Sequence, residues 1–182
     1  MSKITDHYSR LQISLHWLMA LMIIGGLAMG VYLQDLPLSP LKLKLIAWHK
    51  WNGITVLLLF AVRLAVRHLQ GAPALPANMP GWQQQAAVWG HRMLYLLMLL
   101  IPLSGWLMSS AKGFGVVYFG VLPLPDLVGK NADLADLFKN AHALLNQLLL
   151  LVLAGHIGAA LKRHYLERDD VLTRMLPFLK QR

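Results

Sequence analysis

Four long apolar segments, each close to the thickness of a bilayer, most constrain how this chain can fold. They cover residues 14–34, 48–68, 88–110 and 141–163. A helix needs about 20 mainly apolar residues to cross the hydrocarbon core. Because 57% of the residues are hydrophobic and only 14% are charged, a water-soluble surface would be hard to build. The sequence therefore predicts an all-α integral membrane four-helix bundle, with a single domain over residues 1–182.

The connections between these segments carry helix-breaking residues. "QGAPALPANMPG", between the second and third segments, contains three prolines and two glycines and is typical of a loop. "GFGVVYFGVLPLPDLVGKNADLADLF" predicts a longer, irregular connection that is apolar enough to lie on the membrane surface. The end of the chain, "LERDDVLTRMLPFLKQR", predicts a short amphipathic tail at the interface. The N-terminal segment lacks a small-residue cleavage site and is expected to be retained.

Two features of the composition exclude whole classes of function. The chain has no cysteine, which excludes disulfides, iron–sulfur clusters, thiolate-bound zinc and covalently attached c-type haem. The net charge of +9 could suggest a nucleic-acid partner. Most basic residues, however, flank the apolar segments instead of forming a separate basic domain, so the expected partner is a lipid bilayer and no nucleic acid.

The distribution of lysine and arginine predicts the orientation. One face of the membrane would hold eleven of the seventeen: Lys3, Arg10, Arg63, Arg67, Arg92, Lys162, Arg163, Arg168, Arg174, Lys180 and Arg182. The other would hold Lys42, Lys44, Lys50, Lys112, Lys130 and Lys139. Since cytoplasmic loops carry the excess of positive charge, both termini are expected to be cytoplasmic, in a bacterial inner membrane.

Four histidines fall at two matched depths. His142 and His156 are fourteen residues apart, which is about 40° short of four helical turns and about 21 Å of rise, so they share one helix face. His49 lies at the depth of His142 on the outer side, and His16 lies at the depth of His156 on the inner side. The sequence therefore offers an outer pair, His49 with His142, and an inner pair, His16 with His156.

Facing histidines at one depth form a bis-imidazole site, which can bind the iron of a b-type haem without covalent attachment. Two such sites predict two haem b. The alternatives are ordinary polar residues that hydrogen-bond across helices, or a zinc site, although buried pairs without carboxylates supply few zinc ligands. Arg63 lies fourteen residues after His49, at the inner depth, where a haem propionate would supply its counter-charge. Arg63 could equally extend to the cytoplasmic surface. Arg10 is a second propionate candidate.

The residues also resemble a known family. "HYSRLQISLHWLMA", "AWHKWNGITVLLLFAVRLAVR", "GHRMLYLLMLLIPLSGWLM" and the two spaced histidines followed by "HYLERDDVLTRMLP" are similar to the bacterial cytochrome b561 family, over about nine-tenths of the chain. The resemblance implies a dihaem bundle of the inner membrane. It assigns the four axial ligands to His16, His49, His142 and His156.

The resemblance further implies an enzyme, a superoxide:quinone oxidoreductase. Superoxide would be oxidised to dioxygen on the periplasmic side, and the electrons would pass through the haems to ubiquinone. Lys112 and Lys50 are then expected to attract the superoxide anion, unless they are merely solvated flanking charges.

The residues of the quinone site are left open. His164, Arg163 and His91 are candidates on the inner side, and a site near the outer haem would instead involve Trp48, Trp51 or the end of the third helix. An alternative function is a membrane anchor and electron-transfer subunit that links a dehydrogenase, a hydrogenase or a periplasmic carrier to the quinone pool. That function would require a redox partner protein. A structural protein or transporter without haem is the remaining alternative.

Overall fold

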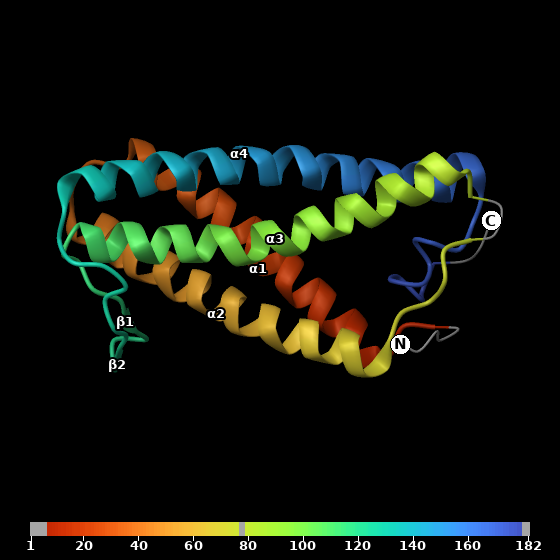
Figure 1. Cartoon of the computed structure of the whole chain (residues 1–182), viewed down its shortest axis with the longest axis horizontal. Coiled ribbons are helices and arrows are strands. Elements are labelled where there is room, and N and C mark those ends of the chain that lie inside the picture. The colour runs from red at the N-terminus through yellow and green to blue at the C-terminus, as the bar shows by residue number, and fades with distance from the viewer. Residues whose placement is uncertain (1–6, 77–78, 180–182) are drawn as a thin grey trace.

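The computed structural model describes residues 7–76 and 79–179. Its four long helices are α1 (Arg10–Asp35), α2 (Pro40–Gln70), α3 (Gly81–Ala111) and α4 (Ala132–Lys162). They lie along one axis, and both termini emerge at the same end of the bundle (Figure 1). We call this the termini end and the opposite one the hairpin end. The predicted all-α four-helix bundle is confirmed. Lys3, Lys180 and Arg182, which entered the charge count, lie outside the described residues.

Short polar residues fix where the helices begin. Ser9 accepts a hydrogen bond from the backbone of Gln12, whose side chain in turn accepts one from the backbone of Ser9, and this forms a capping box at the start of α1. Ser39 precedes α2, which begins with Pro40, and Asn131 caps α4. Gln12 also donates to the carbonyl of Gly71, at 2.8 Å, and so ties the start of α1 to the end of α2.

The helices are longer than the predicted spans. At 31 residues α2, α3 and α4 are each about 46 Å long, whereas the hydrocarbon core is about 30 Å thick. The apolar segments are therefore the later parts of α2, α3 and α4, each of which begins seven to nine residues before its predicted span. Residues 132–138, predicted as part of an irregular connection, are helical because Asn131 caps the helix there and Asp133 stabilises its first turn.

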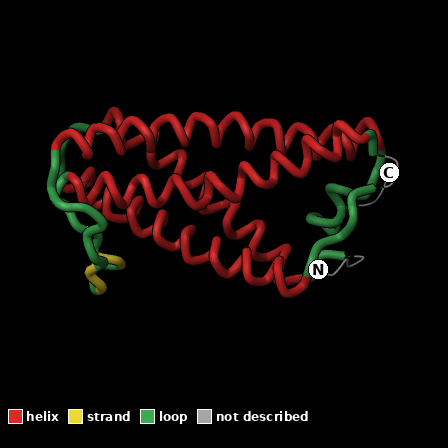
Figure 2. The backbone as a smooth tube through the Cα atoms, in the orientation of Figure 1, coloured by secondary structure: helices red, strands yellow, loops and turns green. Residues whose placement is uncertain are grey.

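The connection between α3 and α4 contains a small hairpin. β1 (Val117–Tyr118) pairs antiparallel with β2 (Leu122–Pro123), and the hairpin lies at the end away from the termini, beside α2. Figure 2 shows these as the only strands drawn in the described chain, with loops gathered at the two ends. The indole of Trp51 donates to the carbonyl of Val117 at 2.7 Å, which attaches β1 to α2.

The C-terminal segment folds back over the termini end. A short π-helix, η1 (Arg163–Glu167), continues α4, and Arg168 then adopts the left-handed conformation with φ of 54° and ends it. The indole of Trp17 donates to the carbonyl of Met175 at 2.8 Å. Arg174 donates to the carbonyl of Ala74 at 2.6 Å. The predicted amphipathic tail thus consists of turns held against α1 and the α2–α3 loop, in place of an extended helix.

The bundle buries a narrow core and exposes an apolar exterior. α3 packs most closely with α4, and α1 with α2. Met19, Leu97 and Leu149 are among the buried core residues. Large apolar side chains such as Leu21 and Leu151 remain about 70% exposed on the outside, at 69% and 71%. All four helices are long and apolar enough to cross a membrane. Such an apolar exterior is stable when it is surrounded by the lipid of a bilayer.

Candidate functional site: two facing histidine pairs

One histidine pair lies toward the hairpin end. His49 comes from α2 and His142 from α4, and their ring centroids are 6.3 Å apart with the ring planes at 82°. Both residues are half-buried between helices. The second pair, toward the termini end, joins His16 of α1 to His156 of α4. Their centroids are also 6.3 Å apart, with the planes at 58°. The structure therefore brings together the two members of each predicted pair.

The separations suit two imidazoles on opposite sides of one metal ion. An imidazole nitrogen binds a transition metal at about 2.0–2.1 Å and lies roughly 1.1 Å from its ring centroid, so the two centroids should be about 6.3 Å apart. Edge-to-face packing of rings without a metal falls in the same range. Among the described residues, no group of three or more His, Cys, Asp or Glu side chains could hold a metal ion. A macrocycle that supplies the remaining four ligands therefore fits this donor set better than zinc does.

The surroundings of His142 leave the correct nitrogen free for a metal. Its Nδ1 lies 3.1 Å from the carbonyl oxygen of Ile101 and 2.9 Å from Ser104 Oγ. A carbonyl can only accept, so Nδ1 carries the proton and Nε2 keeps its lone pair. Gly105 provides the space for the ring, because a Cβ there would lie 3.2 Å from His142 Cε1. The Nδ1 atom of His49 is buried and has no hydrogen-bond partner among the described residues.

His16 has a different neighbour. Its Nδ1 lies 3.3 Å from Nη2 of Arg63. A guanidinium only donates, so this contact puts the proton of a neutral His16 on Nε2. Metal binding at Nε2 therefore requires Arg63 to donate to another acceptor. A haem propionate would be such an acceptor, and the residues at this pair fit the group on that condition.

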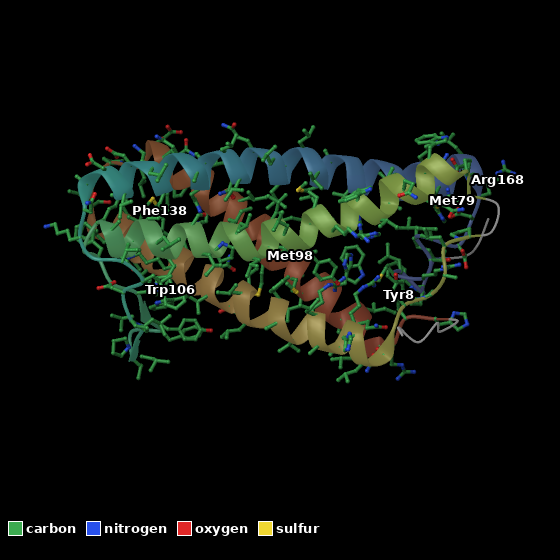
Figure 3. The ribbon with its side chains drawn as sticks, in the orientation of Figure 1. Tyr8, Met79, Met98, Trp106, Phe138 and Arg168 are labelled. Atoms are coloured by element: carbon green, nitrogen blue, oxygen red, sulfur yellow. The ribbon has the colours of Figure 1, made fainter. Side chains whose placement is uncertain are left out.

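A cavity of about 850 Å³ surrounds the pair at the hairpin end. Its polar lining includes both histidines, Asn52, Asn146, Lys50 and Lys112. Figure 3 shows Trp106, another lining residue, at this end, with Met98 nearer the middle of the bundle. A volume in this range is usual for a cofactor site.

The two lysines of this cavity differ in how exposed their charges are. Lys50 is half-buried, and its Nζ donates to the carbonyl of Phe114 at 2.9 Å. It is also attracted by Asp126 and repelled by Lys112. Lys112 is exposed at the end of α3. The more accessible positive charge at this mouth is therefore that of Lys112.

A much smaller cavity, of about 10 Å³, lies at the termini end. Arg63, Arg67, Tyr8 and Tyr95 contribute its polar lining, and Met175 of the C-terminal segment covers it. Tyr8 is labelled in Figure 3 at this end. Two arginines beside one cavity are suited to bind an anionic group. Arg10, the second propionate candidate, is exposed and does not line this cavity.

The quinone candidates occupy three different settings. Arg163 is buried and forms ion pairs with Asp169 and with Glu167, the latter at 2.7 Å. His164 is only 4% exposed, and its Nδ1 lacks a hydrogen-bond partner among the described residues. His91 is exposed, and its ring centroid lies 5.5 Å from that of His156. His91 is therefore the candidate nearest a predicted ligand.

Two residues that take part in these sites were not predicted from the sequence. Arg67 was assigned to the cytoplasmic surface with no role, although it is one helical turn after Arg63 and therefore on the same face. The role of Ser104 could not be predicted, because a single serine within an apolar helix has no distinctive sequence pattern. Its contact with His142 depends on how α3 packs against α4.

Comparisons with known proteins identify relatives over almost the whole chain. Residues 7–178 match the model of the family described as prokaryotic cytochrome b561. Cytochrome b561 homolog 1 of Escherichia coli K12 is 32% identical, over 94% of this chain and 98% of that protein. Cytochrome b561 homolog 2 of the same organism is 31% identical, over 94% and 92%. The probable superoxide oxidase CybB of Yersinia pestis is 32% identical, over 93% and 96%.

Proposed function

Because the chain belongs to the prokaryotic cytochrome b561 family, whose members are membrane electron-transfer proteins that bind b-type haem, we propose that it is a superoxide:ubiquinone oxidoreductase with two haem b. Two superoxide anions would give up one electron each and leave as dioxygen. One ubiquinone would take both electrons and two protons to become ubiquinol. The choice of superoxide as electron donor rests on the similarity to the probable superoxide oxidase.

The observation that carries the proposal is the pair of matched histidine sites. Each has its ring centroids 6.3 Å apart, and fourteen residues of α4 separate them by about 21 Å along the helix. When bound, haem supplies a centre that accepts and donates single electrons. One haem would be held by His49 and His142, and the other by His16 and His156. With two histidines for each iron, the haems would transfer electrons without forming a bond to dioxygen or superoxide.

The orientation follows from charge. We propose that the termini end is cytoplasmic and the hairpin end periplasmic. Eight of the eleven basic residues predicted for the cytoplasmic face are described, and they lie on helix segments or loops at the termini end. Superoxide would then arrive at the cavity around His49 and His142. Lys112, assisted by Lys50, would raise the local concentration of the anion at this mouth.

The protein's tasks at the quinone are to bind the ring and to supply protons. We place these tasks at the termini end, with His91 and His164 as hydrogen-bonding residues. Arg163 would contribute to quinone binding indirectly, because its ion pairs with Asp169 and Glu167 fix the backbone next to His164. Arg63, with Arg67, would bind the propionates of the inner haem.

Stopped-flow absorbance tests this function. The oxidised protein is mixed with superoxide, with and without a soluble ubiquinone. We expect the b-haem bands to appear at a rate that approaches diffusion control, and to decay when quinone is present. Reduction by dithionite but not by superoxide would overturn the assignment of the donor and leave the dihaem bundle intact.

An electron-transfer subunit is the second candidate, and the hairpin favours it. Val121 and Phe119 at the hairpin are 84% and 60% exposed, and such apolar residues could contact a partner protein. Purification in mild detergent separates the two functions. A dehydrogenase, hydrogenase or periplasmic carrier that co-purifies, together with haems that reduce with quinol and not with superoxide, would support the second candidate.

A further inference from the structure

Ser104 lies against the outer face of one predicted haem ligand. It is 6% exposed and belongs to α3, about two turns before the end where Lys112 lies. Its Oγ is 2.9 Å from Nδ1 of His142 on α4 and 2.8 Å from the carbonyl oxygen of Ile101. The same carbonyl is 3.1 Å from Nδ1 of His142. The hydroxyl, the carbonyl and the ring nitrogen therefore form a closed triangle.

Only one arrangement of hydrogens satisfies this triangle. The carbonyl of Ile101 can accept but not donate, so both the Ser104 hydroxyl and His142 Nδ1–H point toward it. Since the hydroxyl proton is directed to the carbonyl, a lone pair of Ser104 Oγ faces Nδ1–H. The imidazole proton is thus shared between two oxygen acceptors, and the serine oxygen is the nearer one.

The other three predicted ligands lack such an arrangement among the described residues. Nδ1 of His49 has no partner there, and Nδ1 of His16 faces the donor Arg63. The ring of His156 contacts the rings of His16 and His91, and no described serine or carbonyl binds its nitrogens. The Ser104 contact therefore distinguishes one ring of the outer pair from the remaining ligands.

We propose that Ser104 is a positioning residue for the outer haem, which fixes the ring plane of His142 and raises its donor strength, while the Ile101 carbonyl sets the tautomer. This inference rests on the proposed ligand role of His142. A hydrogen-bond acceptor on the far nitrogen makes an imidazole a stronger donor to its metal and holds the ring in one orientation. A stronger donor stabilises ferric over ferrous iron and so lowers the midpoint potential.

Redox titration of the purified holoprotein tests the proposal. Ser104→Ala removes the nearer acceptor, and we expect the midpoint potential of one haem to rise while that of the other stays unchanged. His142→Ala, which should lack that haem, identifies which of the two potentials has moved. Ser104→Thr keeps the hydroxyl and should restore the wild-type value.

Electron paramagnetic resonance of the oxidised protein supplies a readout of ring orientation. The rings of His49 and His142 lie at 82°, and nearly perpendicular axial imidazoles give a strongly anisotropic low-spin ferric signal. Ser104→Ala frees the ring of His142 to turn, so this signal should shift or broaden. The signal from the His16 and His156 site, with planes at 58°, should not change.

Ser109→Ala is the matched control. Ser109 is similarly buried, at 4% exposed, and lies on the same helix, but its Oγ donates to the carbonyl of Phe114 and does not contact His142. Potentials and spectra of Ser104→Ala that match those of Ser109→Ala would overturn the inference. Because both readouts need only bound haem, a protein that fails to react with superoxide would refute the proposed function without affecting this test.

Discussion

The histidines of this protein differ in what surrounds each ring, and this difference carries the first prediction. The Nδ1 atom of His142 is held by Ile101 and Ser104, which leaves Nε2 free to bind a metal. His68, by contrast, is exposed in the last turn of α2. We therefore expect His142, and not His68, to be needed for cofactor binding.

Replacing His142 with Ala should reduce the haem content from two to one per chain and abolish reduction by superoxide, because the outer iron loses an axial ligand. The pyridine haemochrome assay measures the content, and stopped-flow absorbance measures the reduction. His68→Ala is the control and should behave as wild type. Full haem content in His142→Ala would contradict the ligand assignment.

A charge at the mouth of the large cavity carries the second prediction. Lys112→Glu changes the local charge by two units and should slow the second-order reaction with superoxide by roughly tenfold at low salt, since steering of this kind is worth 10- to 1000-fold. The difference should shrink as ionic strength rises. Lys139→Glu makes the same change at an exposed site on α4 that does not line the cavity. An equal loss in both variants would remove Lys112 from this role.

At the scale of helices, the contact between α1 and α2 depends on one glycine. The side chain of Asn52 reaches across to the carbonyl of Met22, at 3.1 Å. A Cβ at Gly26 would lie 2.6 Å from Nδ2 of the same asparagine. The absence of a side chain at position 26 is therefore what allows the interhelical hydrogen bond and the close approach.

Gly26→Ala should lower the thermal stability of the protein in detergent, by about 1–3 kcal/mol, because Asn52 must move and lose its acceptor. Gly25→Ala is the matched control, because a Cβ there meets nothing within 4 Å. Both changes carry the same gain in helix propensity, so the difference between their melting temperatures isolates the contact. Equal melting temperatures would show that Asn52 does not depend on position 26.

At the scale of the whole molecule, the two ends of the bundle differ in the size of their cavities. The termini end has Arg63 and Arg67 around a small cavity covered by Met175. The hairpin end has the large cavity and its lysines. Under the proposed function, superoxide would arrive at the larger cavity and ubiquinone would bind at the termini end.

The absence of cysteine makes the orientation testable. Asp136→Cys places one thiol at an exposed position near the start of α4, at the hairpin end, and His7→Cys places one at the termini end. A membrane-impermeant maleimide applied to spheroplasts should label the first and spare the second. Labelling of His7→Cys should appear only after the membrane is permeabilised. The reverse pattern would invert the proposed direction of the reaction.

The sequence determined the class of fold and the depth of the histidines. Both properties depend on spacing along a single chain: apolar length decides which segments can span a membrane, and the rise per residue places His142 and His156 on one helix face. The ends of the helices were less predictable. The helix α4 begins among polar residues such as Asp133, before the apolar pattern starts.

Only the tertiary structure decided which groups touch each ring. Ser104 meets His142, Arg63 meets His16, and Gly26 makes room for Asn52, in each case between helices. Spacing along one helix fixes height and direction, but the rotation of one helix against its neighbour is set by the packing of all four. That is why the sequence predicted the histidine pairs, whereas the hydrogen bond on which the tuning of His142 rests became visible only when α3 was placed beside α4.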